Sequence, residues 1–268
     1  EKRLASARSI TIRGSEWFDH EAQQGGRAID FVRMHDGCSF QEAVTKLLNG
    51  EQGQMFQQTE ERKAAPPKIF VLPPAHHSMR RVYAYLMQQR HIDRDIITYF
   101  ARSGTLYEDA EYHNAVFVGT DEHGVARHAQ KRSTNSQGKA FKLNVEGSDA
   151  RYSFHHLGMD GELYVFEAPI DLLSYLTMNP EDWQRHSYVA CCGTSPIPVM
   201  QMLNPDTQIV YLCLDNDKAG HAASERMAEQ LRERGVMTER LVPELKDWNE
   251  DLCALQDIPN RGPEMRMG

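Results

Sequence analysis

Acidic residues that directly follow apolar segments are the part of this sequence best suited to chemistry. Glu167 follows one such segment, and Asp171 lies one helical turn further along the chain. Asp215 and Asp217 follow a second apolar segment, in the sequence Asp-Asn-Asp. The carboxyl ends of parallel strands meet at one edge of a sheet, and alternate strand positions share a face. We therefore expect these carboxylates to point into one space.

A divalent cation is the expected occupant of that space. Carboxylates that converge at a sheet edge repel one another unless a cation neutralises them. Hard oxygen ligands with room for water favour Mg²⁺ or Mn²⁺. The sequence therefore predicts a Mg²⁺ or Mn²⁺ site with Glu167, Asp215 and Asp217 as its main ligands and Asp171 as a further one.

The elements that must position these acids alternate between strands and helices. Apolar runs predict strands, and helical spacing between them predicts the connecting helices. Strand–helix alternation is typical of a parallel sheet with helices on both faces, so we predict an α/β fold for this part of the chain. The expected strands are 163–166, 187–192, 208–214 and 238–241, and the expected helices are 169–178, 195–203 and 219–234.

Changes in composition divide the chain into five parts. Residues 51–75 are rich in Gln, Glu, Lys and Pro and predict a linker. Before it, Ser39 and Glu42 have the spacing of a capping box at the start of a helix. After it, two helices and a hairpin indicate a smaller α+β domain, which makes the chain α+β overall. The predicted parts are a first segment (1–50), the linker (51–75), the α+β domain (76–158), the α/β domain (159–256) and a tail (257–268).

Charge is distributed unevenly along the chain. The net charge is −8, yet residues 160–268 hold 19 acidic and 9 basic residues, which leaves 19 acidic and 21 basic residues in the first 159. The run from Arg127 to Lys142 contains five basic residues and no acidic one. A metal site beside a polyanion track would produce this pattern, although two solvated surfaces would do so equally well. Five cysteines without a C-x-x-C pair predict a reduced, cytoplasmic protein, and no apolar run is long enough to span a membrane.

Four motifs in residues 163–252 resemble the Toprim domain of bacterial primases and topoisomerases. Glu167–Asp171 matches its glutamate motif, and Asp215–Gly220 matches its D-x-D-x-A-G motif. Cys192-Gly193-Thr194 is similar to the Gly-Thr turn of primases, and 247–252 is similar to the terminal acidic motif. The resemblance implies a Toprim fold. It also implies catalytic roles for Glu167, Asp215 and Asp217, a nucleotide-binding turn at Gly193 and Thr194, and secondary acidic roles for Asp247 and Asp251.

The resemblance extends upstream into the primase catalytic core. Tyr83–Leu86 followed by Arg90-His91-Ile92 is similar to the Y-L-x-x-R-G-I helix, with His91 in place of the usual Gly. Residues 114–132 and 139–144 look like the primase stretch that lines the template and nucleotide path. On this basis nucleic-acid or nucleotide contacts are expected from Lys131, Arg132, Lys142 and Asn144. Residues 76–158 look like the uncharacterised domain that often precedes Toprim in proteins of mobile elements.

The first segment resembles the end of a primase zinc ribbon that has lost its metal ligands. The family's cysteines are absent where Trp17 to His20 stand, so no zinc is expected. Neighbouring histidines rarely chelate one metal, so the pairs His76-His77 and His155-His156 are not expected to bind one either.

Taken together, the motifs predict a primase-like, metal-dependent nucleotidyltransferase with two Mg²⁺ or Mn²⁺ ions. Its expected partners are a single-stranded DNA template and nucleoside triphosphates, with a replicative helicase as a further candidate. Replication of a plasmid or another mobile element is the biology that the resemblance implies. Two alternatives remain open, namely a Toprim-type nuclease that cleaves phosphodiesters and a DNA-binding accessory protein without catalysis.

Overall fold

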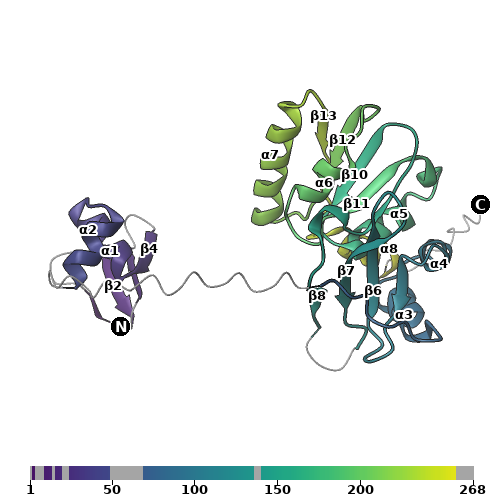
Figure 1. The fold of residues 1–268 in the computed structure, drawn as a ribbon, viewed down its shortest axis with the longest axis horizontal. Helices are drawn as coiled ribbons and strands as arrows, with labels where there is room; N and C mark the ends of the chain where they lie inside the picture. Colours follow the sequence, from purple (N-terminus) through teal and green to yellow (C-terminus); the bar gives the residue numbers. More distant parts are fainter. Residues whose placement is uncertain are drawn as a thin grey trace, which may run out of the picture. The chain divides into compact units, whose positions relative to one another are not determined.

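The computed structural model describes residues 2–3, 9–13, 16–19, 24–48, 69–135 and 140–257. The chain forms two compact units, Glu1–Pro66 and Pro67–Gly268, shown in Figure 1. Most of the predicted linker, His20 and all but the first residue of the predicted tail lie outside the described residues. Within the described ranges, no helix has both the length and the hydropathy that a membrane span requires.

The first unit combines an antiparallel sheet with two short helices. Ser39 accepts the Glu42 main-chain N–H, and the Glu42 carboxylate accepts the Ser39 N–H, so the predicted capping box is confirmed. Trp17 packs edge-on against Phe31, with ring centroids 5.4 Å apart, and thereby joins sheet to helix. The strands pair in the order β1-β2-β3-β4. The elements are β1 (Lys2–Arg3), β2 (Ile10–Arg13), β3 (Glu16–Asp19), β4 (Gln24–Arg27), α1 (Ala28–Asp36) and α2 (Phe40–Leu47).

The second unit begins with a small α+β domain. The first of the two expected helices is interrupted, because α3 gives way to a π-helical turn at Tyr85–Gln89. His91 follows with φ of 55°, a left-handed conformation that favours glycine, and this is the position where the primase motif has Gly. The antiparallel strands have the order β5-β6-β7-β8. The elements are α3 (Arg80–Ala84), α4 (Arg94–Arg102), β5 (Leu106–Glu108), β6 (Ala115–Thr120), β7 (Ala126–Arg132) and β8 (Lys142–Asn144).

The remainder of this unit is the α/β domain that the sequence predicts, and the fold class is confirmed. Its sheet has the order β13-β12-β10-β11-β9. The four long strands are parallel, but β9 pairs antiparallel with β11, so the expected parallel sheet is in fact mixed at one edge. The strands are β9 (His155–His156), β10 (Glu162–Phe166), β11 (Ser187–Ala190), β12 (Ile209–Leu212) and β13 (Met237–Arg240). The helices are α5 (Pro169–Met178), α6 (Ile197–Met202), α7 (Lys218–Arg232) and α8 (Trp248–Asp257).

Side-chain alternation along β10 divides the core between the two faces of this sheet. Leu163 and Val165 are buried in a cluster with residues of α6 and α7. Phe166 is buried in a second cluster that combines α5 and α8 with the small domain, including Tyr85 and Phe100. Figure 1 shows α7 on one side of the sheet and α5 with α8 on the other. The two domains of the second unit therefore share one apolar core.

Close packing at Gly220 generates a first prediction. Gly220 lies in the first turn of α7, and a Cβ atom there would collide with the main-chain oxygen of Asp215. Gly220→Ala should therefore lower the free energy of unfolding by about 1–3 kcal/mol, as overpacking typically does. Urea unfolding measures the effect, and Ala219→Ser, which adds one atom at the exposed neighbouring position, is the control. Equal stability of the wild type and Gly220→Ala would contradict the packing argument.

Candidate functional site

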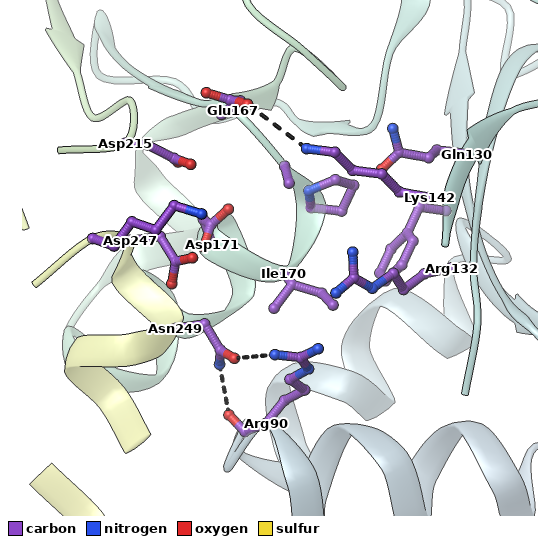
Figure 2. A pocket seen from close by; sticks show the side chains of 14 residues that line it. Arg90, Gln130, Arg132, Lys142, Glu167, Ile170, Asp171, Asp215, Asp247 and Asn249 are labelled. Carbon is purple, nitrogen blue, oxygen red and sulfur yellow. Dashed lines mark hydrogen bonds and ion pairs between the residues drawn. The ribbon is translucent and has the colours of Figure 1, made fainter. Parts of the chain in front are cut away.

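A cavity of about 270 Å³ opens at the carboxyl edge of the mixed sheet, where the small domain meets the α/β domain. Figure 2 shows acidic side chains on one side of this cavity and basic side chains facing them. Its acidic residues are Glu167, Asp171, Asp215 and Asp247, and its basic residues are Arg90, Arg132, Lys142 and Lys246. We call this space the acidic cavity.

Glu167 stands directly beyond the end of β10. Its main-chain oxygen accepts the Gly193 N–H at 3.0 Å, which fixes the strand end against the turn that follows β11. Its carboxylate forms an ion pair with Lys142, with Nζ 3.7 Å from Oε1. Lys142 belongs to β8 of the small domain, so this contact joins the two domains across the cavity.

Asp215 lies three residues beyond the end of β12. Arg240 donates to its main-chain oxygen at 2.9 Å, while its side-chain Oδ1 is buried without a hydrogen-bond partner among the described residues. Burial raises the pKa of the Asp215 carboxyl to about 6, and the charges of Glu167 and Asp247 act in the same direction. A buried carboxylate oxygen without a donor is suited to a cation ligand.

Asp171 and Asp247 complete the acidic side of the cavity. Asp171 is buried in the first turn of α5, and burial together with the charges of Asp247 and Asp215 raises its pKa well above the ordinary value. The main-chain N–H of Asn249 acts against this rise in the pKa of Asp171. Asp247 precedes α8 and accepts the Glu250 N–H at 2.8 Å, so helix capping fixes its position.

Two other predicted acids bind main-chain N–H groups instead of lining the cavity. Asp217 was expected to share a strand face with Asp215, but β12 ends at Leu212, and Asp217 is the N-cap of α7, where it accepts the Gly220 N–H at 2.8 Å. That hydrogen bond lowers its pKa. Asp217 does not line the acidic cavity, although its charge contributes to the raised pKa of Asp215. Asp251 accepts the N–H groups of two residues in the loop before α8 and holds that loop in place.

The basic and polar residues predicted to contact nucleic acid do not all lie on the cavity side of the small domain's sheet. Arg132 and Lys142 line the acidic cavity. Lys131, one position from Arg132, points to the other face and pairs with buried Asp109 at 3.3 Å. Asn144 does not line the cavity, but its Oδ1 accepts a hydrogen bond at 2.9 Å from Nε2 of Gln130, which does.

The predicted nucleotide-binding turn lies beside Glu167 rather than in the cavity lining. Gly193 has φ of 151°, within the range that favours glycine, and its N–H is the group that contacts Glu167. Thr194 is partly exposed next to it.

Sequence reasoning missed several residues that line the cavity. Arg90 donates to Tyr85 Oη at 2.9 Å and to Asn249 Oδ1 at 3.0 Å, as Figure 2 shows for the second contact. Arg132 donates to the same Tyr85 oxygen at 3.2 Å, so one phenol holds two guanidinium groups. Arg90 follows Tyr85-Leu86 after three residues, one more than in the Y-L-x-x-R spacing of primases, and this resemblance was a usable signal. Lys246 lies outside every motif of the sequence analysis, so no signal in the sequence pointed to it.

No three carboxylates of the acidic cavity have oxygen atoms that all lie within 4.8 Å of one another, among the residues that the structure describes. Among the described residues, sets of three ligand atoms within 4.8 Å of one another occur at His76, Glu108 and His113 and at Asp160, Glu162 and His186. Repulsion between like charges disfavours a tighter cluster in the acidic cavity. The donor set there, carboxylate oxygens with one orphaned Oδ1, fits a hard divalent cation.

The α/β domain thus carries its acidic cavity at the carboxyl edge of a mostly parallel sheet, where open α/β folds commonly bind ligands. Residues 164–252 match the family described as Toprim-like, and residues 84–160 match a protein family of unknown function, DUF3991. The chain therefore carries a Toprim-like domain preceded by a DUF3991 domain, and the predicted family resemblance is confirmed.

Known proteins similar to this chain include one curated relative and several primases. An uncharacterised protein of Bacillus anthracis is 27% identical over 224 residues, which are 75% of this chain and 62% of that protein. The chain thus spans less than two thirds of this relative. The primase fragment of the bacteriophage T7 primase-helicase is 12% identical, with a TM-score of 0.46 over 93% of this chain and 90% of its own. The E. coli primase catalytic core is 17% identical, with a TM-score of 0.47 over 66% of this chain and 69% of its own.

The raised pKa of Asp215 generates a second prediction. The folded protein binds this proton more tightly than the unfolded chain, so the contribution of Asp215 to stability falls as pH rises from about 4 to about 6. At pH 7.5 Asp215→Asn should raise the free energy of unfolding by about 1–2 kcal/mol, allowing for partial solvent screening. At pH 4.5 the gain should fall to about a third of that value, because the folded protein then keeps the proton while most of the unfolded chains have lost it. Chemical unfolding at both pH values measures it.

Asp217→Asn is the matched control for this prediction. The pKa of Asp217 is lowered, so its charge is favourable, and its substitution should give no gain at pH 7.5. Mg²⁺ should stabilise the wild type more than Asp215→Asn, since only the wild type has the full set of repelling charges. A gain of equal size for Asp215→Asn at both pH values would show that charge repulsion at this position is not its source.

Proposed function

We propose that this protein is a primase-like, metal-dependent nucleotidyltransferase that acts on single-stranded DNA. The observation that carries the proposal is the opposition of charges in the acidic cavity, where Arg90, Arg132 and Lys142 lie across from four acidic side chains. Nucleotide polymerisation brings a triphosphate and a strand end together with divalent cations, and such a cavity suits all three.

The acidic side of the cavity would hold the cations. Glu167 and Asp215 are the proposed main ligands, with Asp171 and Asp247 beside them and Asp217 acting from the start of α7. When bound, Mg²⁺ or Mn²⁺ supplies charge neutralisation and activation of a hydroxyl group for in-line attack on a phosphate. Lys142 would leave its ion pair with Glu167 and become free to contact phosphate oxygens.

The basic side would position the substrate. The two guanidinium groups of Arg90 and Arg132 are fixed by Tyr85, so both lose little conformational freedom when they bind a phosphate. Gly193 and Thr194, in the turn tied to Glu167, are proposed nucleotide contacts. Single-stranded DNA, nucleoside triphosphates and a helicase remain proposed partners, and replication of a plasmid or another mobile element remains the proposed context.

The third prediction concerns synthesis itself. Incubation with single-stranded DNA, labelled nucleotides and Mg²⁺ or Mn²⁺ should yield extension products that Asp215→Asn and Glu167→Gln each reduce by at least about 100-fold, as loss of an electrostatic catalytic group does. Asp160→Asn, on an acid outside the cavity, is the control and should retain activity. Cleavage fragments in place of extension products would identify a nuclease and overturn the proposal, and DNA binding without either product would identify an accessory protein.

The fourth prediction concerns the nucleic-acid path. Each phosphate contact that is lost should reduce the salt dependence of single-stranded DNA binding by about 0.7 in the logarithmic slope. Arg132→Ala and Lys142→Ala should each show this loss, measured by fluorescence anisotropy at several salt concentrations. Arg127→Ala is the matched control, because Arg127 is exposed on the same strand, pairs with Asp121 and does not line the cavity. Unchanged slopes for both cavity variants would place the path elsewhere.

A further inference from the structure

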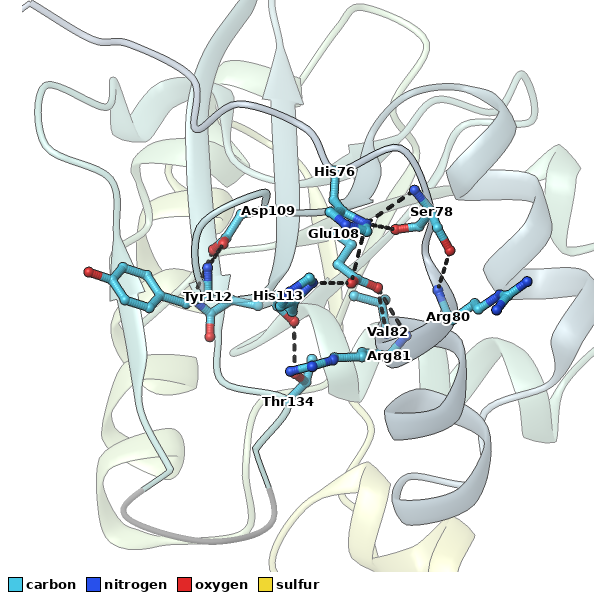
Figure 3. Close-up of polar contacts among 11 residues, drawn as sticks. His76, Ser78, Arg80, Arg81, Val82, Glu108, Asp109, Tyr112, His113 and Thr134 are labelled. Carbon is cyan, nitrogen blue, oxygen red and sulfur yellow. Dashed lines mark hydrogen bonds and ion pairs between the residues drawn. The ribbon is translucent and has the colours of Figure 1, made fainter.

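Two histidines and a glutamate of the small domain converge outside the acidic cavity. We call His76, Glu108 and His113 the His–Glu–His cluster, which Figure 3 shows. One possible ligand atom of each residue lies within 4.8 Å of the others. None of the three lines the acidic cavity, so the proposed nucleotidyl transfer does not use them.

Main-chain pairing brings these residues together. Ala75 forms a β-bridge with Asp109, and the His76 N–H donates to the Glu108 oxygen at 2.8 Å, which places the two side chains next to each other. A tight turn then reverses the chain, with the His113 N–H donating to the Asp109 oxygen at 3.2 Å. The turn returns His113 to the side of Glu108.

Glu108 is held in the orientation that a metal ligand needs. It is only 2% exposed, and its Oε2 accepts the main-chain N–H groups of Arg81 and Val82 at 3.0 and 3.2 Å. Its other oxygen, Oε1, faces the two imidazoles, 2.6 Å from His113 Nδ1 and 3.7 Å from His76 Nδ1. Secondary contacts of this kind fix the ligands of metal sites.

The backbone at His113 is strained in a way that presents its ring to Glu108. Its φ is 59°, a left-handed conformation that non-glycine residues adopt rarely and at an energetic cost. The His113 main-chain oxygen accepts the Thr134 hydroxyl at 2.8 Å, which helps to hold this conformation. The His76 and His113 rings meet edge to face, with centroids 4.7 Å apart.

We propose that the His–Glu–His cluster binds one transition-metal ion of the Zn²⁺ class. Two imidazole nitrogens and one carboxylate oxygen form a ligand set that Zn²⁺ takes with water in the fourth position. The histidine side chains are 23% and 26% exposed, which leaves a path for that water. His76 Nδ1 now contacts the Ser78 main chain at 2.9 and 3.2 Å, and His113 Nδ1 contacts Glu108 Oε1 at 2.6 Å. The ion would replace these contacts, and a proton shared between His113 and Glu108 would leave to solvent.

Such an ion would attach the segment before α3 to β5. Glu108 already binds the N-terminus of α3 through Arg81 and Val82, so the metal would connect this helix, the preceding segment and the turn that carries His113. A bound ion of the Zn²⁺ class here would differ from the sequence-based expectation of no zinc. Of the neighbouring pair His76-His77, only His76 belongs to the cluster. Glu108 and His113 lie more than 30 positions further along the chain, so their proximity to His76 could not be predicted from the sequence.

A Co²⁺ titration of the whole chain tests the proposal. The titration contains ten millimolar Mg²⁺, which competes for oxygen sites such as the acidic cavity. The visible absorption bands of Co²⁺ then report binding to nitrogen ligands. We expect saturation at one equivalent, loss of the bands on addition of Zn²⁺, and a metal-dependent rise in the thermal midpoint. His76→Ala and His113→Asn should each weaken Co²⁺ binding at least ten-fold, and Asn tolerates the left-handed backbone at position 113.

Matched controls separate this cluster from other histidines. His123→Ala removes an exposed histidine beside Glu122, and His186→Ala disrupts the cluster with Asp160 and Glu162. Both variants should bind Co²⁺ as the wild type does. Glu108→Gln keeps an oxygen for the α3 N–H groups, and it should weaken metal binding while the circular dichroism spectrum stays unchanged. Absence of bands in the wild type, or equal affinity in all variants, would show that the cluster is only a hydrogen-bonded anchor.

Discussion

Repulsion among carboxylates in a partly buried cavity is the constraint on which the rest of this structure depends. Glu167 and Asp215 reach the cavity because two neighbouring parallel strands, β10 and β12, end at the same edge. Asp171 and Asp247 add charge from α5 and from the residue before α8. Removing such groups from water and placing them near one another costs free energy, and the raised pKa values of Asp215 and Asp171 report that cost.

Fixed main-chain contacts and opposing cations offset this cost. The oxygens of Glu167 and Asp215 are bound by Gly193 and Arg240, so the strand ends cannot spread apart freely. Lys142 approaches from the small domain and pairs with Glu167. Its charge also opposes the rise in the pKa of Asp215. The shared apolar core and Asn249, which contacts Arg90 and Ser174 at once, hold the two domains in this relation.

Local patterns in the sequence were sufficient for the elements and for part of the site. Apolar runs followed by acids identified β10 and β12, and helix α5 spans the predicted residues 169–178 because Pro169 and an apolar face define it. Asp217 was harder to place, because the apolar strand pattern continues through Cys213 and Leu214 while the strand β12 itself ends at Leu212. Arg90 meets Asn249 across 159 positions, and His76 meets His113 through a turn and a β-bridge, so neither contact follows from spacing. Such contacts are set by tertiary packing rather than by local sequence.

The most direct test of the central claim is an anomalous difference map from crystals of this protein soaked in Mn²⁺. The account predicts a peak in the acidic cavity bounded by oxygens of Glu167 and Asp215, with Lys142 moved away from Glu167. A cavity without a peak at millimolar Mn²⁺, with the Lys142–Glu167 ion pair intact, would contradict the claim that these carboxylates together form a divalent-metal site.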